Sequence, residues 1–302
     1  MRTMIRVCIA LLLAALLPAC ADQRTNGREI VVTTNILGDL TRAIVGDTAT
    51  VTVLMPPNAD PHQFAISAQT AARIERAALL VHNGLGLEEG VLRHVSAAEQ
   101  HGVMSISVGE QVDPIRYRGT EGEGPDPHFW TDPERVRRAV AAISARVAEI
   151  DGIDANTVRA NTARYLAELD ELDRWMTERF ATIAPERRKL VTNHHVFGYL
   201  AKHFGFEMIG AVIPGGSTLA APSASDLAEL AATIRAAGVP AIFADSAQPD
   251  RLVRVLAEQV GVRVRVIALY SESLTEPGGG AATYLDMMRA DTEAIVRGLT
   301  AP

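Results

Sequence analysis

Residues 155–183, ANTVRANTARYLAELDELDRWMTERFATI, keep apolar side chains at helical spacing for about eight turns. On both sides of this stretch, short β-branched runs alternate with helical segments, a pattern typical of βα units. The strand-like runs are IVVTTN, ATVTVLM, LLVHNG and VMSISV before it, and LVTN, EMIGAVI, AIFAD and VRVIALY after it. The sequence therefore predicts an α/β fold of two βα lobes joined by one long helix. In such a fold the carboxyl ends of the strands face a cleft between the lobes, where ligands bind.

The amino-terminal residues MRTMIRVCIALLLAALLPAC are typical of a secretory signal. Two arginines precede an apolar run over residues 7–17 that is too short to span a bilayer. LPAC resembles a lipobox, so we expect cleavage before Cys20 and a lipid on its sulfur; ordinary signal cleavage nearby is the alternative. The expected divisions are a lipoprotein signal peptide (1–19), a linker (20–28), an N-terminal βα lobe (29–151), the connecting helix (152–184) and a C-terminal βα lobe (185–302).

Composition narrows the classes of partner. The 302 residues carry a formal charge of -7, so no basic face is available for a phosphate backbone, and we expect no nucleic acid as a partner. Of the two cysteines, Cys8 lies in the signal and lipid would occupy Cys20, which excludes a disulfide within the mature chain. We expect an exported monomer.

The tripeptide Asp-Pro-His occurs twice, in PPNADPHQF and in GPDPHFWTDP, and provides His62 and His128. His194 lies where the strand-like KLVTN leads into a helical segment, so all three histidines fall at strand ends or loops facing the cleft. A single loop histidine is usually only solvated, but three together indicate a metal site, because imidazole is a common ligand of zinc. The proline stiffens the loop, and the aspartate can hold the ring tautomer through a hydrogen bond. His94, His101 and His203 are expected on helix surfaces.

These motifs resemble those of the metal-binding solute-binding lipoproteins of zinc and manganese ABC importers. DPHQF, DPHFWTDP, HHVFGYLAKHFGF and LYSESL…ATYLDMMRAD are similar to the four ligand-bearing segments of that family. The resemblance covers essentially the whole mature chain, and it implies a lipidated cysteine, two βα lobes, one connecting helix and a metal between the lobes. It also implies three partners: a divalent metal ion, an ABC permease, and the membrane that holds the anchor, in the periplasm or at the cell surface.

The resemblance implies metal ligands residue by residue. His62 and His128 match the first two motifs, and the ligand of the third stands three residues before its phenylalanine, which selects His194 over His195. The fourth ligand is implied at Glu272, where the family usually has an aspartate. Asp245, in IFADSAQPD, is the alternative fourth ligand.

Two functions remain open from the residues. Three imidazoles and a carboxylate fill a tetrahedral shell, as a carrier requires, whereas three histidines with water and a general base would suit an exported zinc-dependent hydrolase. Neither His-Glu-x-x-His nor Gly-x-Ser-x-Gly occurs, and the resemblance favours the carrier, so we expect no enzyme. Nitrogen donors favour Zn²⁺ over Mn²⁺, with a manganese- or iron-specific member as the alternative. The stretch YRGTEGEGPDPH, expected as a loop, lacks the His-rich insertion of many zinc-specific relatives.

Overall fold

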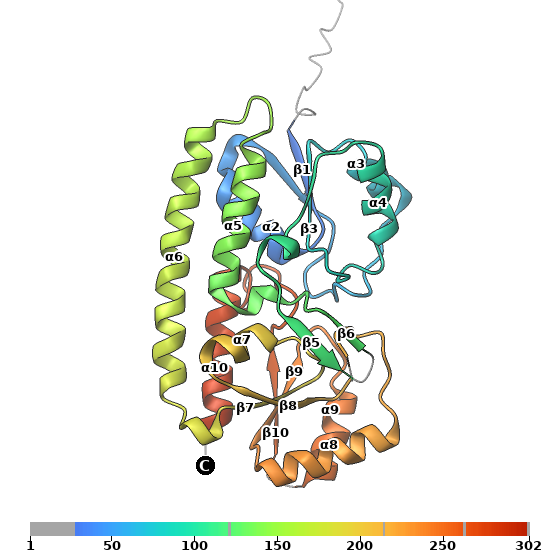
Figure 1. Ribbon diagram of the computed structural model, residues 1–302, viewed down its shortest axis with the longest axis vertical. Helices are drawn as coiled ribbons and strands as arrows, with labels where there is room; N and C mark the ends of the chain where they lie inside the picture. The colour runs from blue at the N-terminus through green and yellow to red at the C-terminus, as the bar shows by residue number, and fades with distance from the viewer. Residues whose placement is uncertain (1–27, 120–121, 214, 262–263, 301–302) are drawn as a thin grey trace, which may run out of the picture.

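The computed structural model describes residues 28–119, 122–213, 215–261 and 264–300, so Cys20 and the predicted signal lie outside the described residues. Each of the two lobes contains a four-stranded parallel sheet (Figure 1). The N-terminal sheet has the order β2-β1-β3-β4, and the C-terminal sheet has the order β10-β9-β7-β8. The strands are β1 (Glu29–Val32), β2 (Thr50–Val53), β3 (Leu79–His82), β4 (Ser105–Ser107), β7 (Lys189–Thr192), β8 (Glu207–Ala211), β9 (Ala241–Asp245) and β10 (Arg265–Leu269).

Both sheets therefore follow one topology, in which the first strand of the lobe lies between its second and third strands. In each lobe the order of the strands reverses beside the first strand, and α/β sheets bind ligands at such a position. The helices are α2 (Asn35–Val45), α3 (Ala68–Ile74), α4 (Leu92–Gln100), α5 (Pro133–Val147), α6 (Ala155–Ala181), α7 (Gly198–Phe204), α8 (Ala224–Ala237), α9 (Arg251–Val260) and α10 (Tyr284–Thr300). Two βα lobes joined by a long helix confirm the predicted fold class.

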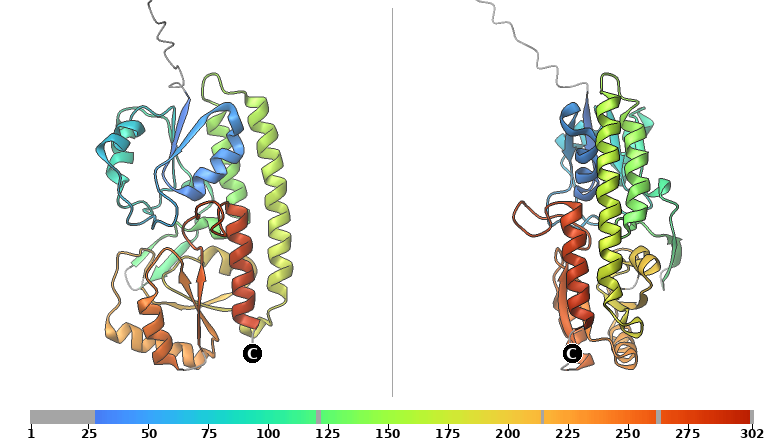
Figure 2. Two further views of the ribbon diagram at one scale, coloured as in Figure 1. Left: turned by 180° about the vertical axis from the view of Figure 1, so that it is seen from behind. Right: turned by 90° about the vertical axis from the view of Figure 1, so that its left-hand side faces the viewer.

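The long helix α6 begins after Asp154, whose side chain accepts a hydrogen bond from the Asn156 amide and so caps the first turn. Its buried side chains recur every three or four residues or at a multiple of that spacing, which makes one apolar stripe: Val158, Tyr165, Leu169, Leu172, Met176 and Phe180. This stripe packs against α2 and α5 of the N-terminal half and against α10 of the C-terminal half (Figure 2). One hydrophobic core consequently runs along α6 through both lobes, from Ile30 to Leu299.

One element differs from the prediction. The stretch expected as a loop before His128 contains an antiparallel hairpin of β5 (Arg116–Gly119) and β6 (Gly122–Pro125), in which Tyr117 pairs with Gly124. Glycine and glutamate dominate this stretch, so it shows no alternation of apolar and polar residues from which a strand is predicted. Within the described part of the chain, no helix is both long enough and apolar enough to cross a bilayer.

Candidate metal site

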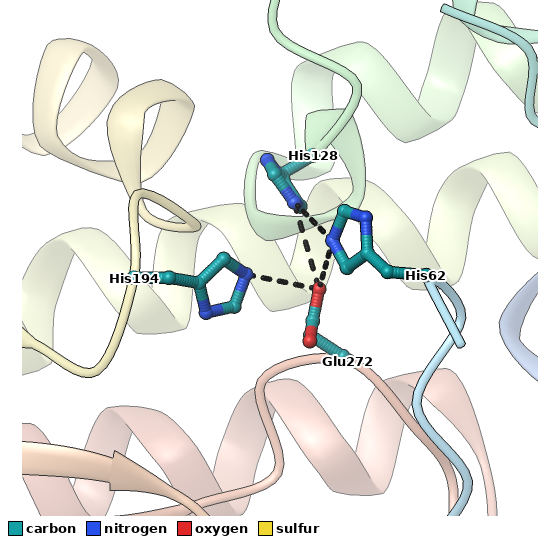
Figure 3. A group of neighbouring side chains, drawn as sticks. All are labelled: His62, His128, His194 and Glu272. Atoms are coloured by element: carbon teal, nitrogen blue, oxygen red, sulfur yellow. Dashed lines mark hydrogen bonds and ion pairs between the residues drawn. The ribbon is translucent and has the colours of Figure 1, made fainter. Parts of the chain in front are cut away.

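Four side chains from distant parts of the sequence meet between the two lobes (Figure 3). His62 follows β2 of the N-terminal sheet, and His194 and Glu272 follow β7 and β10 of the C-terminal sheet, so both parallel sheets provide residues beyond the carboxyl ends of their strands. His128 follows β6 of the hairpin. Each of the four residues is at most 1% exposed. One candidate ligand atom from each lies within 4.8 Å of those of the others, which makes the group small enough to enclose a single ion.

The distances within the group suit tetrahedral coordination. Glu272 Oε1 lies 3.2 Å from His62 Nε2, 3.5 Å from His128 Nε2 and 3.1 Å from His194 Nε2. The Nε2 atoms of His62 and His128 are 3.3 Å apart. In a tetrahedral zinc site with bonds of about 2.0–2.1 Å, neighbouring ligand atoms are separated by about 3.3 Å. These four separations match the spacing of such a site, and all the donor atoms lie within 4.8 Å of one another.

In both Asp-Pro-His motifs the aspartate accepts a hydrogen bond from the amide of the histidine. Asp60 Oδ1 accepts a hydrogen bond from the His62 amide at 2.8 Å, and Asp126 Oδ1 accepts one from the His128 amide at 3.0 Å. Asp126 Oδ1 also lies 2.8 Å from His128 Nδ1, which orients that ring so that Nε2 points into the site. Within the described residues, the buried Nδ1 of His62 has no hydrogen-bond partner. The same tripeptide thus orients the ring in the second motif only.

Charge and burial act against each other in this group. Burial is the largest influence on His128 and favours its neutral form, but hydrogen bonds to Asp126 and Glu272 outweigh it and raise the pKa of His128 to about 9. Burial would also raise the pKa of Glu272, yet the charge of His194 and hydrogen bonds from the imidazoles hold it well below its usual range. In the metal-free protein, these shifts favour an ionised Glu272 beside a protonated His128.

The loop that carries Glu272 is tied to the N-terminal half. The Trp130 indole donates to the Ser271 carbonyl at 2.8 Å. Asn35, the first residue of α2, donates to Ser273 Oγ at 2.8 Å and also accepts from the next amide along the loop. These buried contacts place the Glu272 carboxylate although its loop belongs to the other lobe. Neither Asn35 nor Trp130 is found from local sequence, because each partner lies more than a hundred residues away.

Of the two carboxylates considered for the fourth position, Glu272 lies in the histidine group. Asp245 is buried at the end of β9, where its carboxylate accepts hydrogen bonds from the Ala247 amide at 2.6 Å and from the Ser271 hydroxyl. Burial and the nearby charge of Glu272 raise the pKa of Asp245 to about 7. Asp245 therefore supports the loop of Glu272.

Two further histidines lie near the site or on an adjoining helix. His195 is half-buried and its amide donates to the Gly215 carbonyl at 3.3 Å. His203 is exposed on α7, as expected, and lies 2.6 Å from Asp132 Oδ1 and 3.3 Å from Asp173 Oδ1. These ion pairs join α7 to Asp132, which caps the first turn of α5, and to the middle of α6. The periodicity of a helix gives no signal for contacts with such distant carboxylates.

Comparison with known proteins places this arrangement among metal-binding proteins. A family model described as the periplasmic component A of zinc-uptake complexes matches residues 30–298. The chain is 31% identical to the zinc-binding protein TroA of Treponema pallidum over 92% of this chain and 91% of that protein. It is 26% identical to the manganese-binding lipoprotein MntA of Halalkalibacterium halodurans over 97% of both chains.

Solved structures agree with the fold. The periplasmic zinc-binding protein TroA from Treponema pallidum superimposes with a TM-score of 0.83 at 27% identity, covering 91% of this chain and 99% of that one. A Mn-bound periplasmic metal-binding protein from Candidatus Liberibacter asiaticus gives a TM-score of 0.79 at 26% identity, covering 90% and 99%. Relatives named for zinc and for manganese thus share this two-lobed architecture.

Proposed function

The chain belongs to the family of periplasmic zinc-uptake complex component A proteins, and on this premise we propose that it captures Zn²⁺ outside the cytoplasm and delivers it to an ABC permease. The observation that carries the proposal is the buried group of three imidazoles and one carboxylate, in which Glu272 Oε1 lies 3.1–3.5 Å from all three imidazoles. We assign His62, His128, His194 and Glu272 as the metal ligands. Four protein donors complete a tetrahedral shell, as in sites that hold an ion without activating water.

The same count of donors weighs against a hydrolase. A catalytic zinc site keeps three protein ligands and one open position, in which water is activated. Here Glu272 Oε1 lies about as close to the imidazole nitrogens as the nitrogens of His62 and His128 lie to each other, so the carboxylate takes the place that water would need. A crystal structure of the zinc-loaded protein distinguishes the two functions, since three protein ligands plus water would refute the carrier.

Zinc is favoured over manganese by ligand type. Three nitrogen donors suit zinc, whereas manganese is better served by more carboxylates and water. Binding affinity alone does not decide, because nearly every such site ranks zinc above manganese. The test is therefore cellular: a strain lacking the gene should grow poorly under zinc chelation, and added zinc should restore growth. If manganese or iron restores growth and zinc does not, the ion that restores growth is the cargo instead of zinc.

The fourth ligand is tested by two matched acid variants. We expect Glu272→Ala to weaken zinc binding more than Asp245→Ala, because Glu272 is within 3.5 Å of three imidazoles while Asp245 contacts Ser271 and Ala247. Isothermal calorimetry on both variants measures the difference. A larger loss in the Asp245 variant would reverse the assignment.

Location follows from the amino-terminal segment and the names of relatives. MntA of Halalkalibacterium halodurans is named a lipoprotein, and Cys20 of this chain follows a lipobox-like LPA. We propose that the mature protein is a monomer outside the cytoplasm, held to the membrane by lipid on Cys20. Cys20→Ala should move it from the membrane fraction to the soluble fraction. A wild-type protein found soluble, with an unmodified amino terminus, would exclude the anchor.

A further inference from the structure

The two Asp-Pro-His motifs use their aspartates differently, and the difference concerns the contact between the lobes. Asp126 places one oxygen against both the amide and the ring of His128. Asp60 holds only the His62 amide with Oδ1, and its Oδ2 points elsewhere. That second oxygen accepts hydrogen bonds from three side chains: Gln63 at 2.7 Å, Thr218 at 2.6 Å and Gln248 at 2.5 Å.

Two of these three donors belong to the other lobe. Thr218 lies in the loop from Gly215 to Pro222, between β8 and α8, and Gln248 lies in the loop between β9 and α9. The residue before Thr218 adds a parallel contact, since Ser217 Oγ donates to Glu89 Oε1 at 2.8 Å. The first Asp-Pro-His motif is therefore fastened to two loops of the C-terminal lobe.

The loop from Gly215 to Pro222 is bonded to its own lobe at its first residue, through the His195 amide and the Gly215 carbonyl, and packs less closely beyond it. A cavity of about 350 Å³ lies behind it, between the loop and the beginning of α9, lined among others by Val212, Ala220, Leu252 and Val253. Leu219 is 53% exposed, so its side chain does not anchor the loop either. Gly215, with φ of 101°, begins the loop in a conformation that residues other than glycine rarely adopt. The hydrogen bonds of Ser217 and Thr218 to the N-terminal lobe thus have a large share in holding this loop closed.

Exposure shows which interlobe contacts can open first. The contacts behind the site, from Trp130 to Ser271 and from Asn35 to Ser273, are fully buried. Those around Asp60 are only partly buried, and its bond to Gln63 is exposed. Hydrogen bonds that water can replace cost less to break, so local opening starts at such places. Because the four site residues are at most 1% exposed, an ion leaves only after an opening of this kind.

We propose that Asp60 is a positioning residue that latches the two lobes over the metal site, and that this latch sets the rate at which the metal leaves. The inference rests on the proposed function for its cargo, but the latch itself is a property of the fold. One oxygen of Asp60 fixes the His62 backbone while the other holds Thr218 and Gln248. Breaking the second set of contacts opens the mouth of the site without altering a metal ligand.

The test removes the contacts of Asp60 with the C-terminal lobe and keeps its hydrogen bond to the His62 amide. The double variant Thr218→Val/Gln248→Ala deletes both donors from the C-terminal lobe and leaves Asp60 in place. A matched control, Thr233→Val/Gln259→Ala, changes the same residue types at exposed positions of α8 and α9. Zinc release into excess chelator, followed by stopped flow, should be about tenfold faster in the latch variant, since two hydrogen bonds to a carboxylate are lost, and unchanged in the control. The visible absorption of the cobalt-loaded variant should match wild type, which shows that the four ligands are undisturbed.

A second measurement does not depend on metal. Hydrogen exchange of the amides from Gly215 to Pro222 in the metal-free protein should be faster in the latch variant than in wild type or the control. If the latch variant releases zinc and exchanges its amides at the wild-type rates, the latch is refuted. If its amides exchange faster but zinc leaves at the wild-type rate, the latch does not control the loss of metal. A wild-type protein that binds no divalent ion would refute the proposed function, while the exchange experiment would still test the latch.

Discussion

Replacing Asp126 by asparagine should change the pH dependence of metal binding more than its strength at neutral pH. Asp126 Oδ1 contacts both the amide and Nδ1 of His128, and it is the main favourable contact that raises the pKa of that ring to about 9. A metal binds only the neutral imidazole, so the proton must leave first. Asparagine keeps an acceptor oxygen of the same size but removes the charge.

Two effects of opposite sign determine the size of the change. In the wild type, each pH unit below about 9 should cost about tenfold in affinity through this one proton, which amounts to about a hundredfold at pH 7. In Asp126→Asn the pKa of His128 falls, although Glu272 still raises it, so part of that competition disappears. Against this, loss of the carboxylate behind a ligating histidine lowers intrinsic metal affinity by about 10–100-fold. The variant should therefore bind about 10–100-fold more weakly at pH 9.5 and closer to wild type at pH 7.

The assay is competition with a chelator of known zinc affinity at half-unit steps from pH 6 to 9.5, on both proteins. An NMR titration of His128 in the metal-free proteins measures the pKa directly. Asp60→Asn is an informative comparison, because Asp60 does not contact the ring of its histidine and should leave the slope with pH as in wild type. Equal slopes in wild type and Asp126→Asn, or the same weakening at every pH, would refute the reasoning.

Three further outcomes follow from the site and the core. His194→Ala should weaken zinc binding well over tenfold in calorimetry while His195→Ala leaves it nearly unchanged, and equal losses would contradict the choice between the two. Leu172→Ala should lower the free energy of unfolding by about 2–5 kcal/mol in denaturant titrations, because Leu172 is fully buried on α6, whereas Arg164→Ala on its exposed face should cost less than about 0.5 kcal/mol. Because the pKa of His128 is raised to about 9, its protonation stabilises the metal-free protein fully below about pH 6.5, and this stabilisation is lost as pH rises through about 9. The melting temperature of the metal-free protein should therefore fall across that range, and a rise would contradict the assigned shift.

The agreement between prediction and structure is best where the signal is local. The helix predicted over residues 155–183 is observed at Ala155–Ala181, because its apolar stripe and its Asp154 cap are both written in consecutive residues. The predicted strands occur in the predicted order for the same reason. The hairpin of β5 and β6 was missed, since its strands are only four residues long, have no apolar run of their own and form by pairing with each other. The surface position of His203 was predicted, but its ion pairs were not, because Asp132 and Asp173 belong to other parts of the chain.

The sequence by itself determined which kinds of donor are present and how the backbone of His62 and His128 is held, because Asp-Pro-His carries its aspartate, its rigid proline and its imidazole within three residues. Only the tertiary structure decided that Glu272 rather than Asp245 meets the histidines, since that choice depends on contacts from Asn35 and Trp130 in the other half of the chain. It also decided that two identical tripeptides act differently. Thr218 and Gln248, which turn Asp60 toward the other lobe, lie 158 and 188 residues along the chain, and a separation of that size is closed only by folding.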